Sequence, residues 1–183
     1  MIHQLADVQT QHIGPDTTVW QFSIILEGAQ IGNHCNINCH TFIENKVTIG
    51  NYVTVKSGVY LWDGLQVEDN VFIGPNATFT NDKRPRSKQY PSTFQKTIIR
   101  HHASIGAGAT VLGGVTIGEY AIVGANSLVT KDIPPRSLVL GQPARIVGWI
   151  NEDGSPMESL DVDLFQDNQG NTWKLIDSQI KRL

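Results

Sequence analysis

Apolar residues recur at every sixth position along most of this chain. The residue four positions after each of them is usually small, and turn formers such as Gly, Asn, Asp and Pro are frequent in between. The first run has twelve members: Ile13, Val19, Ile25, Ile31, Ile37, Ile43, Ile49, Val55, Leu61, Val67, Ile73 and Phe79. After one interruption the period resumes at Ile99, Ile105, Val111, Ile117, Val123 and Val129.

A period of six fits neither a helix nor a single long strand. A helical face needs apolar residues at a spacing near 3.6, and frequent Gly and Pro would break a continuous strand. The pattern predicts short strands joined by sharp turns, with the aliphatic residue pointing inward, which is an all-β parallel β-helix. Three repeats then close one triangular coil, and successive coils stack roughly 4.8 Å apart. Residues 18 positions apart are therefore expected to be vertical neighbours.

The interruption between Phe79 and Ile99 predicts a loop excursion over about residues 80–98. Long loops on a rigid scaffold commonly carry function. The segment and its flanks are basic, which suits contact with phosphate because Arg binds it in a bidentate way. A solvated charged loop is the competing explanation. The cations are Lys83, Arg84, Arg86, Lys88, Lys96 and Arg100.

The 18-residue spacing predicts a polar ladder at the corner where this loop leaves. Asn81 is expected above Asp63, and Asp63 above Asn45, with Asp82 at the base of the loop. Hydrogen-bonded turn residues would explain Asn45 without any function. Trp62 is harder to explain at a turn, and its ring could stack on a base or a sugar.

Small residues at another corner also match vertically. Gly106 is expected under Gly124, and Ala107 under Ala125. Corners with so little side chain leave backbone N–H and C=O groups accessible along a smooth groove. Gly and Ala are also common at turns of this kind.

Composition points to an ordinary globular chain. It has 183 residues, 40% of them apolar, and a formal net charge of −3, which argues against nucleic-acid binding. No apolar run is long enough to span a bilayer and no signal peptide is evident, so a cytoplasmic setting is expected. Two cysteines support neither a disulfide framework nor a zinc site. Cys35 falls on an inward position and Cys39 on a turn.

The period ends near Gly148, which predicts a β-helix domain over residues 1–147 and a C-terminal extension over 148–183. Within the extension, residues 165–175 are expected to form a hairpin around Asp167-Asn168-Gln169-Gly170-Asn171. We expect it to pack over the end of the β-helix or against another subunit.

The pattern I-G-x-x-A-x, as in Ile105–Thr110 and Ile117–Ile122, resembles that of the hexapeptide-repeat acetyltransferases, over about residues 13–147. The resemblance implies a left-handed coil and a homotrimer with acetyl-CoA between subunits. Residues 124–135 and 141–145 look like the closing motif of these enzymes. By that similarity, acetyl-CoA would be held by Gly106, Ala107, Gly124, Ala125, Lys131, Pro143 and Arg145.

A narrower resemblance is to the nucleotide-sugar 3-N-acetyltransferases. It rests on residues 20–22, 36–37, 42–45 and 61–64, and above all on Phe79-Thr80-Asn81-Asp82-Lys83 with Pro85-Arg86-Ser87. It implies acetylation of a dTDP-3-amino-3,6-dideoxyhexose for bacterial surface glycan or lipopolysaccharide synthesis. The implied substrate-binding residues are Glu44, Asn45, Trp62, Asp63, Lys83, Arg84, Arg86 and Ser87.

The absence of a histidine at Asn81-Asp82 fits an amine acceptor. A sugar hydroxyl needs a general base, which O-acetyltransferases of this superfamily supply as a loop histidine. A neutral amine is already nucleophilic and needs positioning and an oxyanion donor. We therefore expect Asn81 and Asp82 to orient the amine, and a backbone N–H near Ala107 to stabilise the oxyanion. In the resembling enzymes the CoA sulfur can take the proton.

Histidines supply the rival hypotheses. A structural or solvent role is favoured over catalysis for His34, His40, His101 and His102, and among them His40 is the best candidate for a catalytic base. Zinc chemistry of the γ-carbonic anhydrase kind needs three converging histidines, and no metal is expected. An O-acetyltransferase using His40 or His102, or a non-catalytic scaffold, remains open. The sequence also leaves open whether the sugar has the gluco or the galacto configuration, whether the nucleotide is dTDP or UDP, and which group accepts the proton.

Overall fold

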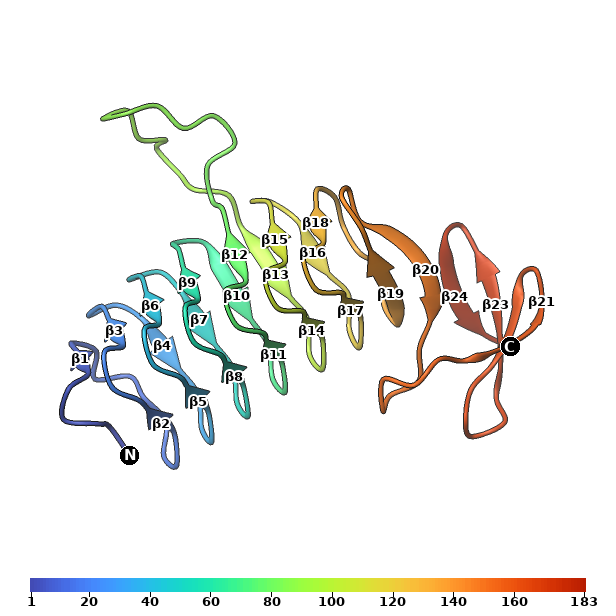
Figure 1. The fold of residues 1–183 in the computed structure, drawn as a ribbon, viewed down its shortest axis with the longest axis horizontal. Coiled ribbons are helices and arrows are strands. Elements are labelled where there is room, and N and C mark those ends of the chain that lie inside the picture. The colour runs from blue at the N-terminus through green and yellow to red at the C-terminus, as the bar shows by residue number, and fades with distance from the viewer.

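The computed structural model describes residues 1–183 and consists of strands and turns only. Three parallel sheets form the sides of a coil, and Figure 1 shows the coils stacked along the long axis. The chain contains no helix long and apolar enough to cross a membrane.

Each sheet takes one short strand from almost every coil. The seven-stranded sheet contains β1 (Asp7–Val8), β3 (Ile24–Ile25), β6 (Phe42–Ile43), β9 (Tyr60–Leu61), β12 (Thr78–Phe79), β15 (Thr110–Val111) and β18 (Leu128–Val129). The five-stranded sheet contains β4 (Gln30–Ile31), β7 (Thr48–Ile49), β10 (Leu65–Val67), β13 (Thr97–Ile99) and β16 (Thr116–Ile117). The eight-stranded sheet contains β2 (Thr18–Val19), β5 (Asn36–Ile37), β8 (Thr54–Val55), β11 (Phe72–Ile73), β14 (Ser104–Ile105), β17 (Ile122–Val123), β19 (Ser137–Leu140) and β20 (Arg145–Trp149).

The strand register confirms the predicted vertical neighbours. Ile25 pairs with Ile43 and Ile43 with Leu61, a step of 18 positions. Across the interruption Val67 pairs with Ile99, a step of 32 positions, so the loop is inserted without disturbing the stack. The excursion occupies residues 80–96, because β13 begins at Thr97. Figure 1 shows it projecting from the coil between β12 and β13.

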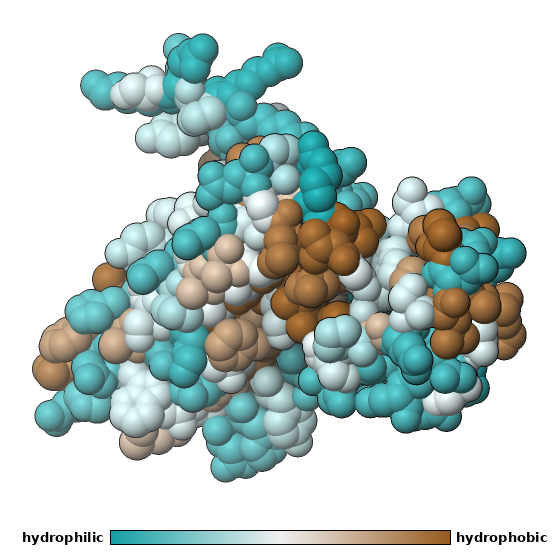
Figure 2. Space-filling view, turned by 45° about the vertical axis from the view of Figure 1, so that its right-hand side comes forward, coloured by the Kyte–Doolittle hydropathy of each residue, from teal (hydrophilic) through white to brown (hydrophobic).

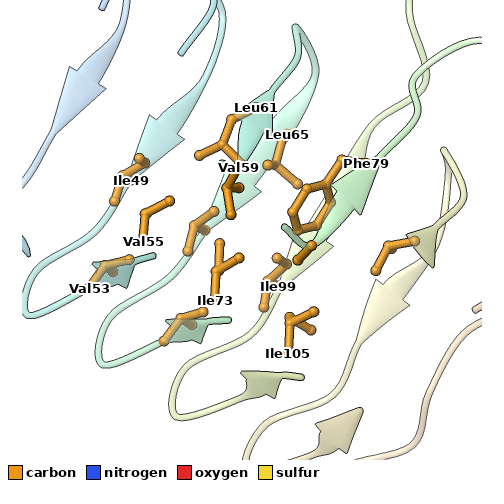
Figure 3. Close-up of a cluster of buried hydrophobic side chains, with 14 of the residues drawn as sticks. Ile49, Val53, Val55, Val59, Leu61, Leu65, Ile73, Phe79, Ile99 and Ile105 are labelled. Atoms are coloured by element: carbon orange, nitrogen blue, oxygen red, sulfur yellow. The ribbon is translucent and has the colours of Figure 1, made fainter. Parts of the chain in front are cut away.

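The inward positions build one continuous core. The six-residue series from Val19 onward is buried, and Figure 3 shows part of it, including Leu61, Ile73 and Ile105, converging inside the coil. The small positions are buried as well, among them Ala29, Cys35, Ala103, Ala109 and Ala121. Fully burying an aliphatic side chain contributes about 1.5–3 kcal/mol. The predicted all-β parallel β-helix is confirmed; its left-handedness stays an expectation from the resemblance.

The corners of the coil form three edges, which we name by their residues. The glycine edge leads from the eight- to the seven-stranded sheet and includes Phe22, His40, Gly106, Ala107, Gly124 and Ala125. The loop edge leads from the seven- to the five-stranded sheet and includes Glu44, Asn45, Trp62, Asp63, Asn81 and Lys131. The ring edge leads from the five- to the eight-stranded sheet and includes His34, Tyr52, His101, His102, Tyr120 and Arg136.

Positive backbone φ angles place His and aromatic residues at two of these edges. His34, His40 and His102 have φ of 55°, 58° and 61°, the left-handed conformation that closes each turn. Asn, Asp and His adopt this conformation more readily than most residues. Turn geometry is therefore a sufficient reason for a histidine at each position.

A four-stranded antiparallel sheet covers the C-terminal end of the coil. It contains β21 (Glu158–Asp161), β22 (Leu164–Gln166), β23 (Thr172–Ile176) and β24 (Gln179–Arg182). The predicted hairpin is confirmed, since β22 pairs with β23 around residues 167–171. Phe165 lies edge-on to Trp149, and Asn168 N–H donates to Asn151 Oδ1 at 3.0 Å, so this cap packs over the end of the β-helix. Strand β20 runs across the boundary expected at 147/148.

Candidate functional site

Side chains at the loop edge form the expected vertical ladder. Asn81 Nδ2 donates to Asp63 O at 3.1 Å, and Asp63 Oδ1 accepts from Lys46 N at 2.7 Å. Glu44 Oε2 accepts from Asp63 N at 2.6 Å, and Asn45 Oδ1 accepts from Gly28 N at 3.2 Å. Each bond satisfies a backbone group of a neighbouring turn. The lower rungs therefore have a structural function whatever else they do.

At the base of the loop, two side-chain oxygens stay free. Asn81 O accepts from Gln95 N at 3.1 Å, which closes the loop onto the coil. Asp82 Oδ1 accepts from Arg84 N at 2.8 Å. Asn81 Oδ1 and Asp82 Oδ2 have no partner within the chain, and both residues are half-buried. Two adjacent acceptors held on an ordered backbone are suited to binding an N–H group.

Lys83 is a loop cation whose ammonium group lies near Gln95 and Gly114 at the base of the loop. With its amide turned to the orientation that the neighbouring atoms favour, Gln95 donates to Gly113 O at 3.1 Å and accepts from Lys83 Nζ at 3.2 Å. The remaining polar residues of the excursion are exposed: Arg84, Arg86, Ser87, Lys88 and Lys96. Figure 2 shows the projecting loop as almost wholly hydrophilic.

Arg100 does not belong to the basic loop. It lies at the start of the ring edge, beyond β13, where its guanidinium pairs with Glu68 at 2.6 Å. Grouping it with the loop cations was wrong, because the whole width of the five-stranded sheet separates the ring edge from the loop edge.

Trp62 lies between two cavities. On one side it borders a very small cavity shared with Asn81, Gln95 and Thr97. On the other it borders a hollow of about 400 Å³ on the outer face of the seven-stranded sheet. Its ring lies 5.5 Å from Phe42 and 6.1 Å from Tyr60, measured between centroids. We call this second cavity the aromatic hollow; its lining is Phe22, Ile24, His40, Thr41, Phe42, Tyr60 and Trp62.

Sequence reasoning selected Trp62 but missed most of the aromatic hollow. The available signal was the outward position just before each buried residue. Ile24, Phe42 and Tyr60 occupy it in three successive coils of one sheet, and they are paired through the strand register. A vertical run of large apolar residues facing outward is unusual on a solenoid and indicates a surface that something covers.

The glycine edge has the expected vertical match. A Cβ at Gly106 would lie 2.5 Å from Ala125 N, and one at Gly124 would lie 2.0 Å from Leu140 Cδ2. Close stacking of coils therefore requires glycine at position 106, where the neighbouring atoms are backbone, whereas a side chain at position 124 would displace the Leu140 side chain. Ala107 and Ala125 are exposed, and their backbone N–H groups make no hydrogen bond within the chain. These free donors are what a bound amide or an oxyanion would need.

The other residues that we expected to contact acetyl-CoA lie in two separate parts of the chain. Lys131 is exposed at the loop edge, beside Asp132, and not at the glycine edge. Pro143 and Arg145 are exposed where the chain turns from β19 into β20. Within one chain, the structure does not gather the whole expected set.

The ring edge accounts for three of the histidines. His34 stacks on Tyr52 at 4.7 Å and His102 on Tyr120 at 4.6 Å, with interplanar angles of 9° and 1°. His101 Nε2 lies 2.9 Å from Glu119 Oε2. The chain has no group of three or more His, Cys, Asp or Glu side chains arranged for a metal ion.

The stack at the ring edge continues into the C-terminal cap. The guanidinium of Arg136 lies 4.7 Å from the ring centroid of Tyr120 and 5.0 Å from that of Trp173, and it pairs with Glu152 at 2.7 Å. A cation between two aromatic faces stabilises the junction of coil and cap. The stack therefore provides a structural explanation for the positions of His102 and Tyr120.

Three groups away from these edges have shifted pKa values. Burial in the core raises the pKa of the Cys35 thiol. Hydrogen bonds from the hydroxyl and backbone of Ser155 lower the pKa of Asp153. Partial desolvation opposes ionisation of Asp167, but hydrogen bonds from Asn171, Trp173 and the backbone outweigh it and hold its pKa at about 2.

Comparison with known proteins supports the class that these features define. Residues 96–131 match the model of the bacterial transferase hexapeptide family (six repeats). No curated protein sequence matches the chain significantly. The chain has a parallel β-helix fold, and its resemblance to hexapeptide acetyltransferases is confirmed.

Among solved structures, the chain is similar to perosamine N-acetyltransferase from Caulobacter crescentus in complex with CoA and GDP-perosamine. Identity is 23%, with 72% of this chain and 56% of that chain covered and a TM-score of 0.63. It is also similar to AntD, an N-acyltransferase from Bacillus cereus in complex with dTDP and CoA, at 23% identity, 78% and 85% coverage and a TM-score of 0.69. At this identity the shared feature is the fold.

A third similar structure is a hexapeptide-repeat acetyltransferase from Vibrio cholerae in complex with acetyl-CoA. Identity is 29%, with 68% of this chain and 72% of that chain covered and a TM-score of 0.58. The chain thus spans most of the Vibrio protein, but only about half of the length of the Caulobacter enzyme.

Proposed function

We propose that the protein is an acetyl-CoA-dependent N-acetyltransferase that acts on the 3-amino group of a dTDP-3-amino-3,6-dideoxyhexose. The observation that carries this is the loop base: Asn81 and Asp82 present two free acceptor oxygens, and no histidine lies at that edge. The solved structures of similar fold include enzymes in complex with CoA and a nucleotide or nucleotide sugar. We place the reaction in bacterial surface glycan synthesis in the cytoplasm.

An amine acceptor explains how this site can work without a protein base. Asn81 Oδ1 and Asp82 Oδ2 accept hydrogen bonds from the amine and point its lone pair at the acetyl carbonyl carbon. The C–N bond forms as the carbonyl oxygen becomes an oxyanion, which the free N–H of Ala107 stabilises. When the C–S bond breaks, the CoA sulfur takes the proton that the nitrogen loses. Lys83 lies at the same edge, placed for the sugar diphosphate.

The site requires two copies of the chain. The free N–H groups of Ala107 and Ala125 lie at the glycine edge, whereas Asn81 and Asp82 lie at the loop edge. A full strand of the seven-stranded sheet with its turns separates the two edges, a span of about 15 Å. In a homotrimer the glycine edge of one copy can face the loop edge of the next and complete the acetyl-CoA site. Lys131 would then approach the CoA phosphates from the loop-edge side, and Pro143 and Arg145 the adenine from the other.

A thiol-release assay tests the proposed function. The protein is incubated with acetyl-CoA and dTDP-3-amino-3,6-dideoxyglucose, its galacto epimer, or the matching 3-hydroxy sugars. We expect rapid CoA release with one amino sugar and none with the hydroxy analogues. Repeating the assay with UDP-linked amino sugars settles the nucleotide. If no nucleotide sugar causes CoA release, the proposal is contradicted, and either an acceptor hydroxyl on another molecule or a non-catalytic scaffold is favoured.

A second candidate is an O-acetyltransferase acting on a sugar or an antibiotic with His40 as the base. His40 is exposed, lies at the same edge as Ala107 and Ala125, and borders the aromatic hollow. Its ring stacks on Phe22 at 5.2 Å, and neither ring nitrogen has a partner that would fix the tautomer. Acetylation of the 3-hydroxy analogue by the wild type, lost in His40→Asn, would establish this alternative.

A further inference from the structure

The outer face of the seven-stranded sheet changes character along the coil. From β3 onward its outward positions are Ile24, Phe42 and Tyr60 in three successive coils, then Thr78 and Thr110, and finally Leu128. Phe22 and His40 flank the apolar part on the glycine edge, and Trp62 flanks it on the loop edge. In Figure 1 this region covers β3, β6 and β9, on the N-terminal side of the loop.

The aromatic hollow has the properties of a small-molecule subsite. Its volume is about 400 Å³, and five of its seven lining residues are hydrophobic. Pockets of this size, with aromatic walls and few polar groups, commonly bind the apolar part of a ligand. Tyr60 is 50% exposed and Phe22 51%, so water covers these rings in the isolated chain. The lining residues with polar side-chain atoms are His40, Thr41, Tyr60 and Trp62.

Trp62 connects the aromatic hollow to the loop base. It lines both the hollow and the small cavity that contains Asn81. By the register of the coil, Thr80 stands directly above Trp62, so Asn81 lies one coil higher than the rings of Tyr60 and Trp62. Coils are spaced roughly 4.8 Å apart, which is about the width of a hexose ring. A sugar lying on these two rings can therefore reach Asn81 with a substituent.

We propose that the aromatic hollow binds the 6-deoxyhexose ring of the nucleotide amino sugar, with its C6 methyl group against Phe42 and Tyr60. This inference rests on the proposed function and names the part of the substrate that the hollow recognises. The C–H bonds of the sugar face the electron-rich ring faces, while the amine points toward Asn81 and Asp82. The diphosphate extends toward Lys83. A hydroxyl on C6 would lose its hydration against the rings of Phe42 and Tyr60.

Steady-state kinetics on the intact protein tests the proposal with two kinds of change. The first replaces the 6-deoxy amino sugar by its 6-hydroxy counterpart; we expect kcat/KM to fall by about 10- to 100-fold. The second is Tyr60→Ala, for which we expect KM for the amino sugar to rise about tenfold while KM for acetyl-CoA stays unchanged. Tyr60→Phe should restore most of the affinity. Tyr52→Ala, which removes an equally exposed tyrosine at the ring edge, is the matched control.

The outcomes separate the two proposals. If the wild type acetylates an amino sugar but Tyr60→Ala leaves its KM unchanged, the hollow is not the sugar subsite and the proposed function survives. If no nucleotide amino sugar is acetylated, the proposed function fails and this inference fails with it. The native mass of each variant is measured in parallel. Loss of the assembly in Tyr60→Ala but not in Tyr52→Ala would show that the hollow is a subunit contact, and would overturn the proposal.

Discussion

Two groups of aromatic and histidine side chains lie on the outside of this coil, and they differ in whether they are closed. At the ring edge, His102 stacks on Tyr120, and Arg136 continues the stack to Trp173 of the cap. In the aromatic hollow, Phe42, Tyr60 and Trp62 meet edge-on or tilted and leave about 400 Å³ open. At the ring edge the guanidinium of Arg136 covers the stack, whereas the rings of the aromatic hollow border open space.

The comparison teaches that residue type alone is a poor guide to function on a solenoid. His102 follows the basic loop closely in sequence, yet it lies at a different edge, where its ring stacks on Tyr120. Tyr60 and Phe42 look like ordinary strand residues, yet they border the largest apolar hollow that we find beside the loop base. Position around the coil decides which aromatic residues are available to a substrate.

The largest effect that we expect is on turnover, and it tests the contrast between the loop base and the ring edge. Asn81→Ala should lower kcat by about 100-fold or more, because it removes a group that orients the nucleophile. Binding of acetyl-CoA should change little. His102→Asn should keep most of the activity. Initial rates under saturating acetyl-CoA measure both; unchanged turnover in Asn81→Ala, or collapse in His102→Asn, would reverse the roles that we assign.

The next largest effect is expected on stability, at the stack of Tyr120, Arg136 and Trp173. Arg136→Ala should destabilise the protein by about 1–3 kcal/mol, because two cation–π contacts are lost at a side chain that is only 13% exposed. Chemical denaturation followed by tryptophan fluorescence measures the change. Arg136→Lys keeps the charge near Glu152 but not the planar stacking, so its loss should be intermediate. If Arg136→Lys destabilises the protein as much as Arg136→Ala does, a positive charge without planar stacking contributes nothing to stability.

A smaller effect is expected from the exposed end of the ring edge. Tyr52→Ala removes the partner of His34 and should cost about 0.5–1.5 kcal/mol without altering kinetics. Tyr52→Phe should be close to neutral, because the ring remains. A change in KM for the amino sugar in Tyr52→Ala would contradict the division between a closed and an open group.

The smallest effect is on the pH dependence of the cap. The folded pKa of Asp167 is about 2 and its reference value is 3.8. The stabilisation is therefore fully present above pH 4 and is lost as the pH falls through 2. Tryptophan fluorescence of the cap should show loosening in this window, and Asp167→Asn should remove the pH dependence. An unchanged acid transition in that variant would show that Asp167 does not contribute.

The periodic part of this protein was predictable from its sequence. Residues 18 apart contact one another, so the inward series, the small inward positions and the ladder of Asn45, Asp63 and Asn81 follow from counting. The loop was visible as a break in the period, and the C-terminal hairpin from its turn residues. In a solenoid each coil touches only its neighbours, which makes a periodic pattern a nearly complete description of the contacts.

Tertiary structure decided what does not repeat. The return of Lys83 onto Gln95, the pairing of Arg100 with Glu68 and the stack from Tyr120 through Arg136 to Trp173 join segments that no fixed spacing relates. The open aromatic hollow likewise depends on how far each ring tilts from its neighbour. The sequence determines which side chains reach a given face of the coil. Whether they close on one another or leave room for a substrate depends on rotamers and on the packing of the loop and cap, which only the folded chain defines.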